Sequence, residues 1–128
     1  MFPKELRYTK QDEWIRRENG EFTVGITAHA AKQLGDITYL ELPEIERVVS
    51  QGEEVAVLES VKAVSDVLAP VGGRVTAVNT VLAEHPETIN ASPYGEGWVF
   101  KLDNVDPYEL ATLMTADEYA ALVAELKD

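Results

Sequence analysis

The sequence predicts a mainly β protein in which many short strands are followed by helices that pack on the outside. Over the first two thirds of the chain, short runs rich in β-branched and aromatic residues alternate with turn residues. The pair Asn19-Gly20 lies between two such runs and is a strong hairpin signal. From Asp106 onward the pattern changes to helix caps and to apolar residues at helical spacing.

Length and composition favour a single domain. The chain has 128 residues, 45% of them apolar, which suits one domain with a modest core. No apolar run approaches the roughly 18 residues that a membrane span needs, and the N-terminus has no signal-peptide core. We therefore expect one domain over residues 1–128, in the bacterial cytoplasm and without a membrane partner.

The chain is strongly acidic, with a net charge of -12 from 23 acidic and 11 basic residues. Phosphate binding needs a basic face, so this charge argues against nucleic acid and against anionic membrane surfaces. Two interpretations stay open. The acidity either keeps a small protein in solution, or it attracts basic surfaces of partner proteins.

The N-terminal third predicts a hairpin, a short helix and a strand. The expected elements are a strand at 13–16, a turn at 18–21, a strand at 22–26, a helix at 28–34 and a strand at 36–42. Thr27 is expected to cap the helix, and Gly35 to end it at a left-handed position. Residues 36–42 alternate at period two until Pro43 ends the strand.

The middle of the chain predicts further strands around a second hairpin. The expected elements are a turn at 48–53, strands at 55–58 and 67–70, a tight turn at Gly72-Gly73, a strand at 74–79, a helical or looped excursion at 80–90, a loop at 93–97 and a strand at 98–102. These elements complete a predicted core of about residues 7–102.

The C-terminal quarter predicts helices, as an extension over about residues 106–127. Asp106 is an N-cap followed by Pro107 at the first helical position. Thr115 and Glu118 form a capping box for a second helix. Its apolar residues recur at spacings of three and four and are Tyr119, Leu122, Val123 and Leu126.

The sequence offers no independent catalytic constellation. The two histidines, His29 and His85, are far apart and in no metal-binding spacing. The absence of cysteine excludes disulfides, thiolate metal sites and a cysteine nucleophile. Neither a Gly-x-Ser-x-Gly elbow nor a phosphate-binding Gly-rich loop is present. We therefore expect a carrier or binding module with no catalytic residue and no metal of its own.

The most informative segment is residues 59–66, Glu-Ser-Val-Lys-Ala-Val-Ser-Asp, between two strand-like runs. It places Lys62 at the tip of a predicted hairpin, where a lysine faces solvent and other proteins. Two interpretations follow from these residues alone: an ordinary solvated turn lysine, or a lysine that an enzyme modifies and that then carries a group. Its neighbours are small, partly apolar and acidic at both edges, and they leave one amine for an enzyme to find.

An ordered set of short motifs runs through most of the chain. The motifs are Tyr8-Thr9, Glu13-Trp14-Ile15, Val24-Gly25-Ile26-Thr27, Leu34-Gly35-Asp36, Glu41-Leu42-Pro43, Glu59-Ser60-Val61-Lys62-Ala63, Ser65-Asp66, Pro70, Val78-Asn79, Asn90, Pro93-Tyr94-Gly95 and Gly97-Trp98. With these motifs at these spacings, residues 7–102 resemble the glycine cleavage system H-protein family. The Glu-Ser-Val-Lys-Ala core differs from the Met-Lys-Met usual in biotin carriers and from the Asp-Lys-Ala usual in lipoyl domains of 2-oxo acid dehydrogenases.

The resemblance implies a barrel-sandwich hybrid of two antiparallel sheets, with lipoate joined to Lys62 by an amide. It implies a carrier that takes the aminomethyl group of glycine from a pyridoxal-phosphate glycine decarboxylase to a tetrahydrofolate-dependent aminomethyltransferase. An FAD-dependent dihydrolipoamide dehydrogenase then reoxidises the dihydrolipoyl group. Lipoylating enzymes are further partners, and a monomer suits such a shuttle.

The resemblance also implies two contacts for the loaded arm. In the family the arm lies against the acid before the tryptophan and the acid four residues after the lysine, which are Glu13 and Asp66 here. Carboxylates favour a cationic amine, and a water-poor cleft protects a group that hydrolyses. A second interpretation of Glu13, as a solvated acid at a strand end, stays open.

Departures from the family pattern occur beside these motifs. Asp12 stands where the family usually has histidine, and Leu68 where an aromatic residue is frequent. Because of Asp12, the resemblance does not determine which polar groups line the cleft. Two alternatives to the glycine cleavage role are a donor of lipoyl groups to other complexes and a binding module of the same fold without lipoate. The full motif around Lys62 argues against the second.

Overall fold

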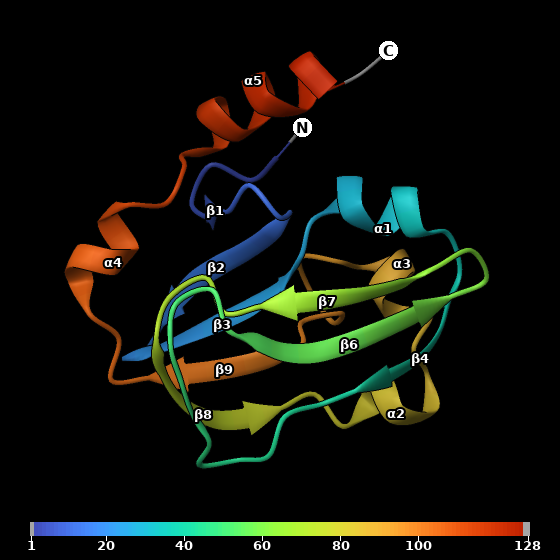
Figure 1. The fold of residues 1–128 in the computed structure, drawn as a ribbon, viewed down its shortest axis with the longest axis horizontal. Coiled ribbons are helices and arrows are strands. Elements are labelled where there is room, and N and C mark those ends of the chain that lie inside the picture. Colours follow the sequence, from blue (N-terminus) through green and yellow to red (C-terminus); the bar gives the residue numbers. More distant parts are fainter. Residues whose placement is uncertain (1, 127–128) are drawn as a thin grey trace.

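Two antiparallel sheets form the framework of the protein (Figure 1), and the computed structural model describes residues 2–126. The larger sheet has the order β1-β2-β3-β9-β8-β5 and the smaller β4-β6-β7. The strands of the larger sheet are β1 (Arg7–Tyr8), β2 (Glu13–Glu18), β3 (Glu21–Ile26), β5 (Val48–Val49), β8 (Gly73–Val78) and β9 (Phe100–Asp103). Those of the smaller sheet are β4 (Ile37–Glu41), β6 (Glu54–Ser60) and β7 (Val64–Leu68). The predicted mainly β fold with two antiparallel sheets is confirmed.

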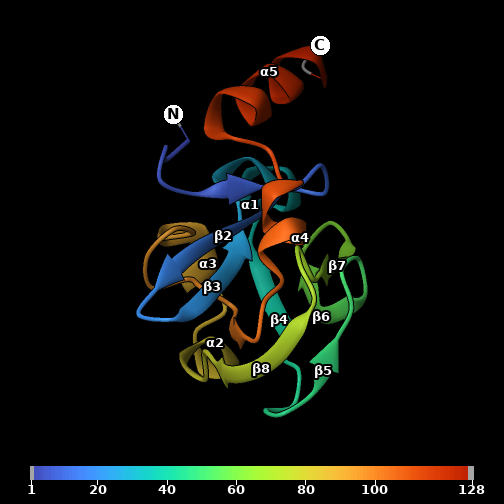
Figure 2. The ribbon, with the colours of Figure 1, turned by 90° about the vertical axis from the view of Figure 1, so that its left-hand side faces the viewer.

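Short helices connect the strands, and a longer helix follows them. The helices are α1 (Ala28–Leu34), α2 (Val81–Glu84), α3 (Thr88–Ala91), α4 (Pro107–Ala111) and α5 (Ala116–Leu126). Figures 1 and 2 both place α5 beyond β1 at one end of the molecule, away from α2, and Figure 2 shows β5 far from α5 as well. Across residues 2–126, no helix has both the length and the apolar character needed to cross a membrane.

The interior consists of two hydrophobic clusters. The main cluster draws on both sheets and includes Ile15, Val24, Leu58, Val67, Val75, Phe100 and Leu102. The second cluster joins the two ends of the chain and consists of Leu6, Tyr8, Trp14, Ala116 and Tyr119. The rings of Tyr8 and Tyr119 stack with centroids 4.8 Å apart. Helix α5 is therefore part of the interior as well as an outer layer.

The N-terminal third follows the prediction closely. Asn19 and Gly20 form the hairpin tip with φ of 50° and 83°, as a tight turn of the primed type requires. The Thr27 hydroxyl caps α1 by accepting from the N–H of Ala30. Gly35 ends α1 at positive φ (77°), but its ψ of -157° lies in the region reserved for glycine and outside the predicted left-handed helical one.

Other predictions are corrected by strand pairing. Residues 48–49 were expected in a turn, but they form β5 and pair with Arg74 and Gly73 of β8. The predicted tight turn at Gly72-Gly73 is wrong, because Gly73 already belongs to β8. A Cβ on Gly73 would lie 2.6 Å from the carbonyl oxygen of Asp103, so this glycine permits the close approach of β9.

Strand boundaries differ from the prediction where the ladders are irregular. In β4 the period-two pattern breaks, because a bulge between Ile37 and Tyr39 leaves both Thr38 and Tyr39 exposed. The last strand was expected from residue 98 but begins at Phe100. Strand β7 begins at Val64 and ends at Leu68, which shortens the loop around Lys62 relative to the predicted strand at 67–70.

The C-terminal caps are confirmed. The carboxylate of Asp106 accepts from the N–H of Tyr108 at 2.9 Å, with Pro107 opening α4. Thr115 and Glu118 form both halves of the capping box, with distances of 2.9 Å and 3.2 Å. These caps fix the entry of α5 and so the place of its buried face.

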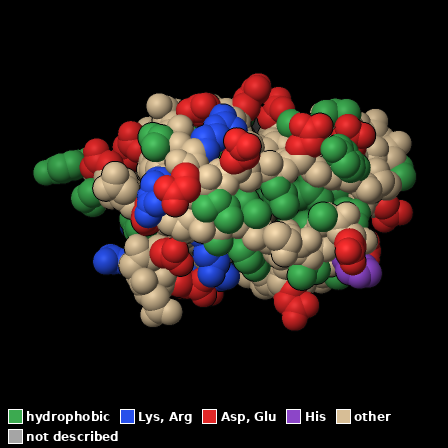
Figure 3. Space-filling model, turned by 90° about the horizontal axis from the view of Figure 1, so that it is seen from below, with side chains coloured by type: hydrophobic (Ala, Val, Ile, Leu, Met, Phe, Trp, Pro, Cys, Tyr) green, Lys and Arg blue, Asp and Glu red, His purple; other side chains and the backbone are tan. Residues whose placement is uncertain are grey.

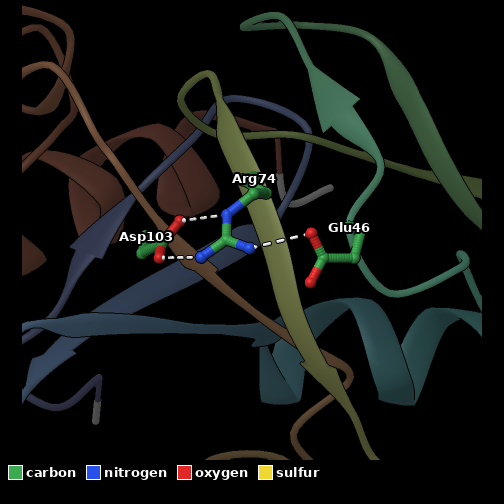
Figure 4. A network of polar contacts seen from close by, with 3 residues as sticks. All are labelled: Glu46, Arg74 and Asp103. Atoms are coloured by element: carbon green, nitrogen blue, oxygen red, sulfur yellow. Dashed lines mark hydrogen bonds and ion pairs between the residues drawn. The ribbon is translucent and has the colours of Figure 1, made fainter.

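One arginine connects three segments of the chain (Figure 4). Arg74 of β8 donates to both carboxylate oxygens of Asp103, at 3.2 Å and 2.6 Å, and to Glu46 at 3.0 Å. Glu46 has a φ of 82°, so this loop residue adopts a backbone conformation that non-glycine residues rarely take. The planar guanidinium suits such a two-sided arrangement.

The face seen from below carries more acidic than basic side chains, with a band of apolar groups between them (Figure 3). The elements at this end include exposed apolar residues Ile45, Val48 and Val81. The acidity of the chain is therefore spread over the surface beyond the Lys62 hairpin, which is compatible with both interpretations of the net charge.

Candidate functional site

Lys62 lies in the three-residue connection between β6 and β7, and its side chain is exposed. The flanking apolar residues Val61 and Val64 are 68% and 67% exposed, so the hairpin tip projects from the protein. Within residues 2–126, no ion pair involves the Lys62 amine. The alkyl part of its side chain passes over Gly35, where an added Cβ would lie 3.4 Å from Cε.

The hydroxyl of Ser60 organises the tip. Its oxygen accepts from the backbone N–H groups of Lys62 and Ala63, at 3.1 Å and 3.0 Å. The backbone N–H of Ser60 donates to the carbonyl of Ala63 at 2.8 Å. A serine side chain that bonds to the backbone two and three residues on stabilises a turn locally. The position of Lys62 is thus fixed by the residue two places before it.

A second anchor reaches the tip from α3. The side chain of Asn90 accepts from the N–H of Ile37 at 3.0 Å and donates to the carbonyl of Gly35 at 2.8 Å. Between these two residues, the carbonyl of Asp36 accepts from the N–H of Val61 at 3.1 Å. Asn90 therefore holds the segment on which the hairpin tip rests.

Glu13 is a buried acid at the start of β2, with 1% of its surface exposed. One carboxyl oxygen accepts from the hydroxyl of Thr9, and the other accepts from the backbone N–H of Leu68 at 3.1 Å. Burial raises the pKa of Glu13 to about 7, with a smaller contribution from the charge of Asp12 and opposition from the two hydrogen bonds. The interpretation of Glu13 as a solvated acid is therefore wrong.

Glu13 and Asp66 line the same cavity, which has a volume of about 160 Å³. Its polar lining is Gln11, Asp12, Glu13, Gln33, Ser65 and Asp66, and its apolar lining is Ile26, Ala30, Leu34, Leu58 and Val67. We call it the acidic cavity. Asp66 is three positions after Ala63 of the tip, roughly 10 Å along the strand, so a long arm on Lys62 would have to fold back to enter the acidic cavity.

A second cavity, of about 280 Å³, lies on another side of Glu13. Its lining includes Tyr8, Thr9, Leu68 and Met114, but neither Asp66 nor any residue of the hairpin tip. The acidic cavity is therefore the one that brings the two predicted acids together near Lys62.

Asp12 also lines the acidic cavity, in a backbone conformation with a φ of 73°. Its carboxylate accepts from the hydroxyl of Tyr119 in α5 at 2.6 Å. At this position, where the family usually has histidine, the aspartate therefore has a hydrogen-bond partner from the far end of the chain.

The site combines an accessible amine with a small cavity of mixed lining. Apolar walls suit an alkyl chain with sulfur atoms, and the carboxylates suit a cationic amine. No group of three or more histidine, cysteine or acidic side chains in residues 2–126 is arranged to hold a metal ion. This arrangement suits the holding and sheltering of a small group.

Sequence reasoning missed the roles of Ser60, Asn90 and Thr9. All three belong to the motifs quoted for the family resemblance, but a motif match does not say which atom a side chain contacts. For Ser60 a signal exists, because a serine two residues before a turn position is typical of side-chain-bonded turns. For Asn90 and Thr9 the contacts depend on the tertiary fold.

Comparisons with known proteins agree with one another. A family model described as "Glycine cleavage H-protein" matches residues 6–126. The chain is 48% identical to the glycine cleavage system H protein of Cronobacter sakazakii and 49% identical to that of Shigella dysenteriae, each over 96% of both chains. It resembles the crystal structure of a glycine cleavage system H protein from Mycobacterium marinum, with a TM-score of 0.87 and 36% identity over 96% of this chain and 99% of the other.

Proposed function

This chain belongs to the glycine cleavage H-protein family, and on that premise we propose that Lys62 bears its lipoyl group and that Glu13 and Asp66 hold the loaded arm. The function of the protein is that of the glycine cleavage system H protein. It is a non-catalytic lipoyl carrier that works with the P, T and L components of the system. Lipoate supplies a dithiolane that opens to accept the aminomethyl group of glycine and is later restored by oxidation.

The observation that carries the Lys62 proposal is its position on the exposed tip between β6 and β7. Ser60 holds the tip in a defined turn, so the amine is presented in one place to a lipoylating enzyme. The nearby acidic cavity has room for a small charged group and has both apolar and carboxylate walls. The residues present therefore fit a lipoyl arm.

Replacing Lys62 tests the attachment directly. Wild-type protein from lipoylating cells should gain the mass of one lipoyl group, and Lys62→Ala should stay unmodified because it lacks the amine. Lys32→Ala removes another exposed lysine, in α1, and should gain the group as wild type does. Intact-mass spectrometry measures all three. A lipoyl group on Lys62→Ala, or none on wild type, would overturn the assignment.

Glu13 and Asp66 are proposed to stabilise the cationic amine of the carried group within the acidic cavity. Both carboxylates face a space that is partly lined by apolar side chains, where charge–charge attraction is screened less than in water. Holding the amine there keeps bulk water from the bond that hydrolysis breaks. Hydrolysis consumes one water and releases the lipoyl thiol, formaldehyde and ammonia.

The double variant Glu13→Gln, Asp66→Asn tests this role. It should lose the carried group on the order of tenfold faster, as expected for lost hydrogen bonds to a charged group. The matched control Glu41→Gln, Glu54→Gln also replaces two acidic side chains, at residues that line a different pocket, and should behave as wild type. Loss can be followed by mass spectrometry of isolated loaded protein. Equal loss rates in both double variants would show that the two acids do not shelter the group.

We further propose that residues 1–128 form one carrier domain, with a core of about residues 7–102 and a helical extension at 106–127, that acts as a cytoplasmic monomer. The bacterial relatives support the location, and the joining of both chain ends in one aromatic cluster supports the single unit. Cell fractionation and sedimentation measurements test these points. A membrane-bound or dimeric protein would contradict them.

A further inference from the structure

The wall of the acidic cavity at Asp12 is connected to the C-terminal helix by a closed ring of hydrogen bonds. The hydroxyl of Tyr119 donates to the Asp12 carboxylate at 2.6 Å and lies 2.8 Å from the Thr27 hydroxyl. The backbone N–H of Thr27 donates to the carbonyl of Asp12 at 2.9 Å. Asp12 is thus held at both its carboxylate and its carbonyl.

The packing around the Tyr119 side chain holds its hydroxyl in these hydrogen bonds. Its side chain is fully buried and its ring stacks on Tyr8 at 4.8 Å with 6° between the planes. Phe2 meets it edge-on at 4.7 Å. Burial, followed by the contact with Asp12, raises the pKa of the Tyr119 hydroxyl, so the hydroxyl stays protonated and available as a donor.

The backbone of Asp12 has a φ of 73°, a conformation that is uncommon for non-glycine residues and in which aspartate is enriched. Its carboxylate is in a cavity wall next to Glu13, and its charge contributes to the raised pKa of Glu13. The titratable groups beside Asp12 include Glu13 from β2 and Tyr119 from α5, and Asp66 from β7 lines the same cavity. A shift of Asp12 would therefore change the electrostatic field in the acidic cavity.

We propose that Tyr119 is a positioning residue that holds the Asp12 carboxylate in the wall of the acidic cavity, as a third anionic group beside Glu13 and Asp66. This inference rests on the proposed role of the cavity in holding the loaded arm. It assigns the C-terminal helix a part in carrier function: α5 sets the charge lining of the cavity through one hydroxyl group.

The test compares two tyrosines of the same stacked pair. Tyr119→Phe removes the hydroxyl that bonds to Asp12, whereas Tyr8→Phe removes a hydroxyl that donates to the carbonyl of Pro3 at 2.6 Å. Both variants keep the ring stack, so any general loosening of the cluster appears in both. Asp12→Asn serves as the reference for complete loss of the charge.

The first readout uses the protein without lipoate. Carbon-13 NMR titration of the Glu13 carboxyl should give a lower pKa in Asp12→Asn than in wild type, and Tyr119→Phe should shift it in the same direction. Tyr8→Phe should leave it unchanged. An unchanged Glu13 pKa in Tyr119→Phe, or an equal shift in Tyr8→Phe, overturns the positioning role.

The second readout is the rate at which loaded protein loses its carried group. Tyr119→Phe should increase that rate roughly two- to fivefold, the factor expected for one misplaced hydrogen-bonded group, and Tyr8→Phe should not. If the Glu13, Asp66 double variant accelerates loss and Tyr119→Phe does not, the inference fails while the cavity's role stands. If Tyr119→Phe shifts the Glu13 pKa but the double variant does not accelerate loss, the cavity's role fails and the positioning contact stands.

Discussion

At the scale of single residues, Glu13 is the least ordinary group in the protein. A carboxylate that is 1% exposed lacks most of the hydration that stabilises the ionised form in water, and burial is the main reason why the pKa of Glu13 rises to about 7. Near neutral pH the side chain is therefore close to half ionised. A cationic group in the acidic cavity would favour the ionised form, so binding of the loaded arm is expected to release a proton from a fraction of the molecules.

The raised pKa makes stability depend on pH. The folded state holds a proton on Glu13 that the unfolded state releases above about pH 4.5, so the stabilisation is complete below that pH and lost by about pH 7. Glu13→Gln is permanently neutral; its amide oxygen can accept from the N–H of Leu68, while its NH2 group can donate to the Thr9 hydroxyl oxygen, which reverses the direction of that bond. Its free energy of unfolding should equal that of wild type at low pH and exceed it above pH 7 by on the order of 3 kcal/mol.

Urea denaturation of both proteins between pH 4 and pH 8 measures this difference, and other titrating groups cancel in it. Glu18→Gln, at the other end of β2, is a control of opposite sign. A hydrogen bond from Thr23 and then the charge of Arg16 hold the pKa of Glu18 below its usual range, so the stabilisation by Glu18 is present above about pH 4.5 and is lost as pH falls below it. Its neutral variant should therefore be less stable than wild type by an amount that stays constant between about pH 5 and pH 8. A difference between Glu13→Gln and wild type that is constant with pH would show that Glu13 titrates normally.

The sequence predicted Glu13 as a site residue only through the family resemblance. Its burial could not be read from the chain, because the hydration of a strand-end acid depends on what packs over it. Here the cover comes from Thr9, from the β7 backbone at Leu68 and from the loop at Asp12. Lys62 was easier to predict, since an exposed turn follows from local pattern alone.

At the scale of elements, the β6–β7 hairpin depends on one hydroxyl. Ser60→Ala removes the acceptor for the N–H groups of Lys62 and Ala63. These bonds are exposed to water, so the free energy of unfolding should fall by about 1 kcal/mol or less. The clearer effect is local: the amide hydrogens of Lys62 and Ala63 should exchange several times faster with solvent.

Hydrogen-exchange NMR measures that effect, and Ser65→Ala is the matched control on the other side of Lys62. Within the described part of the chain, the Ser65 side chain takes part in none of the hydrogen bonds of the turn. Unchanged exchange at Ala63 in Ser60→Ala, or an equal increase in Ser65→Ala, would mean that the turn does not depend on this hydroxyl.

Elements with local signals were predicted well, and those set by pairing were not. The Asn19-Gly20 turn and the caps at Thr27, Asp106 and Thr115 were confirmed because each is specified within a few residues. Strand β5 has two residues, too few for a periodic pattern, and it exists only because β8 lies beside it. The bulge in β4 likewise depends on its register with β6.

At the scale of the whole molecule, the two hydrophobic clusters hold different parts of the structure. The main cluster holds the two sheets and therefore the hairpin that carries Lys62. The second brings the first strands against α5, and through Tyr119 it reaches Asp12 in the wall of the acidic cavity. The sequence predicted an amphipathic C-terminal helix, but its link to Asp12 spans 107 positions and leaves no local trace.

This second cluster also bears on the order in which the protein is completed during synthesis. Ribosomes synthesise a chain from its N-terminus, at roughly 5–20 residues per second. Synthesis of the Lys62 hairpin ends with Leu68, and Tyr119 is added 51 residues later (119 minus 68). At the rate above, this interval lasts roughly 3 to 10 s. During that interval Tyr8 and Trp14 lack their cover from α5, and Asp12 lacks its tether. A nascent chain therefore presents its Lys62 hairpin before the wall of the acidic cavity is complete.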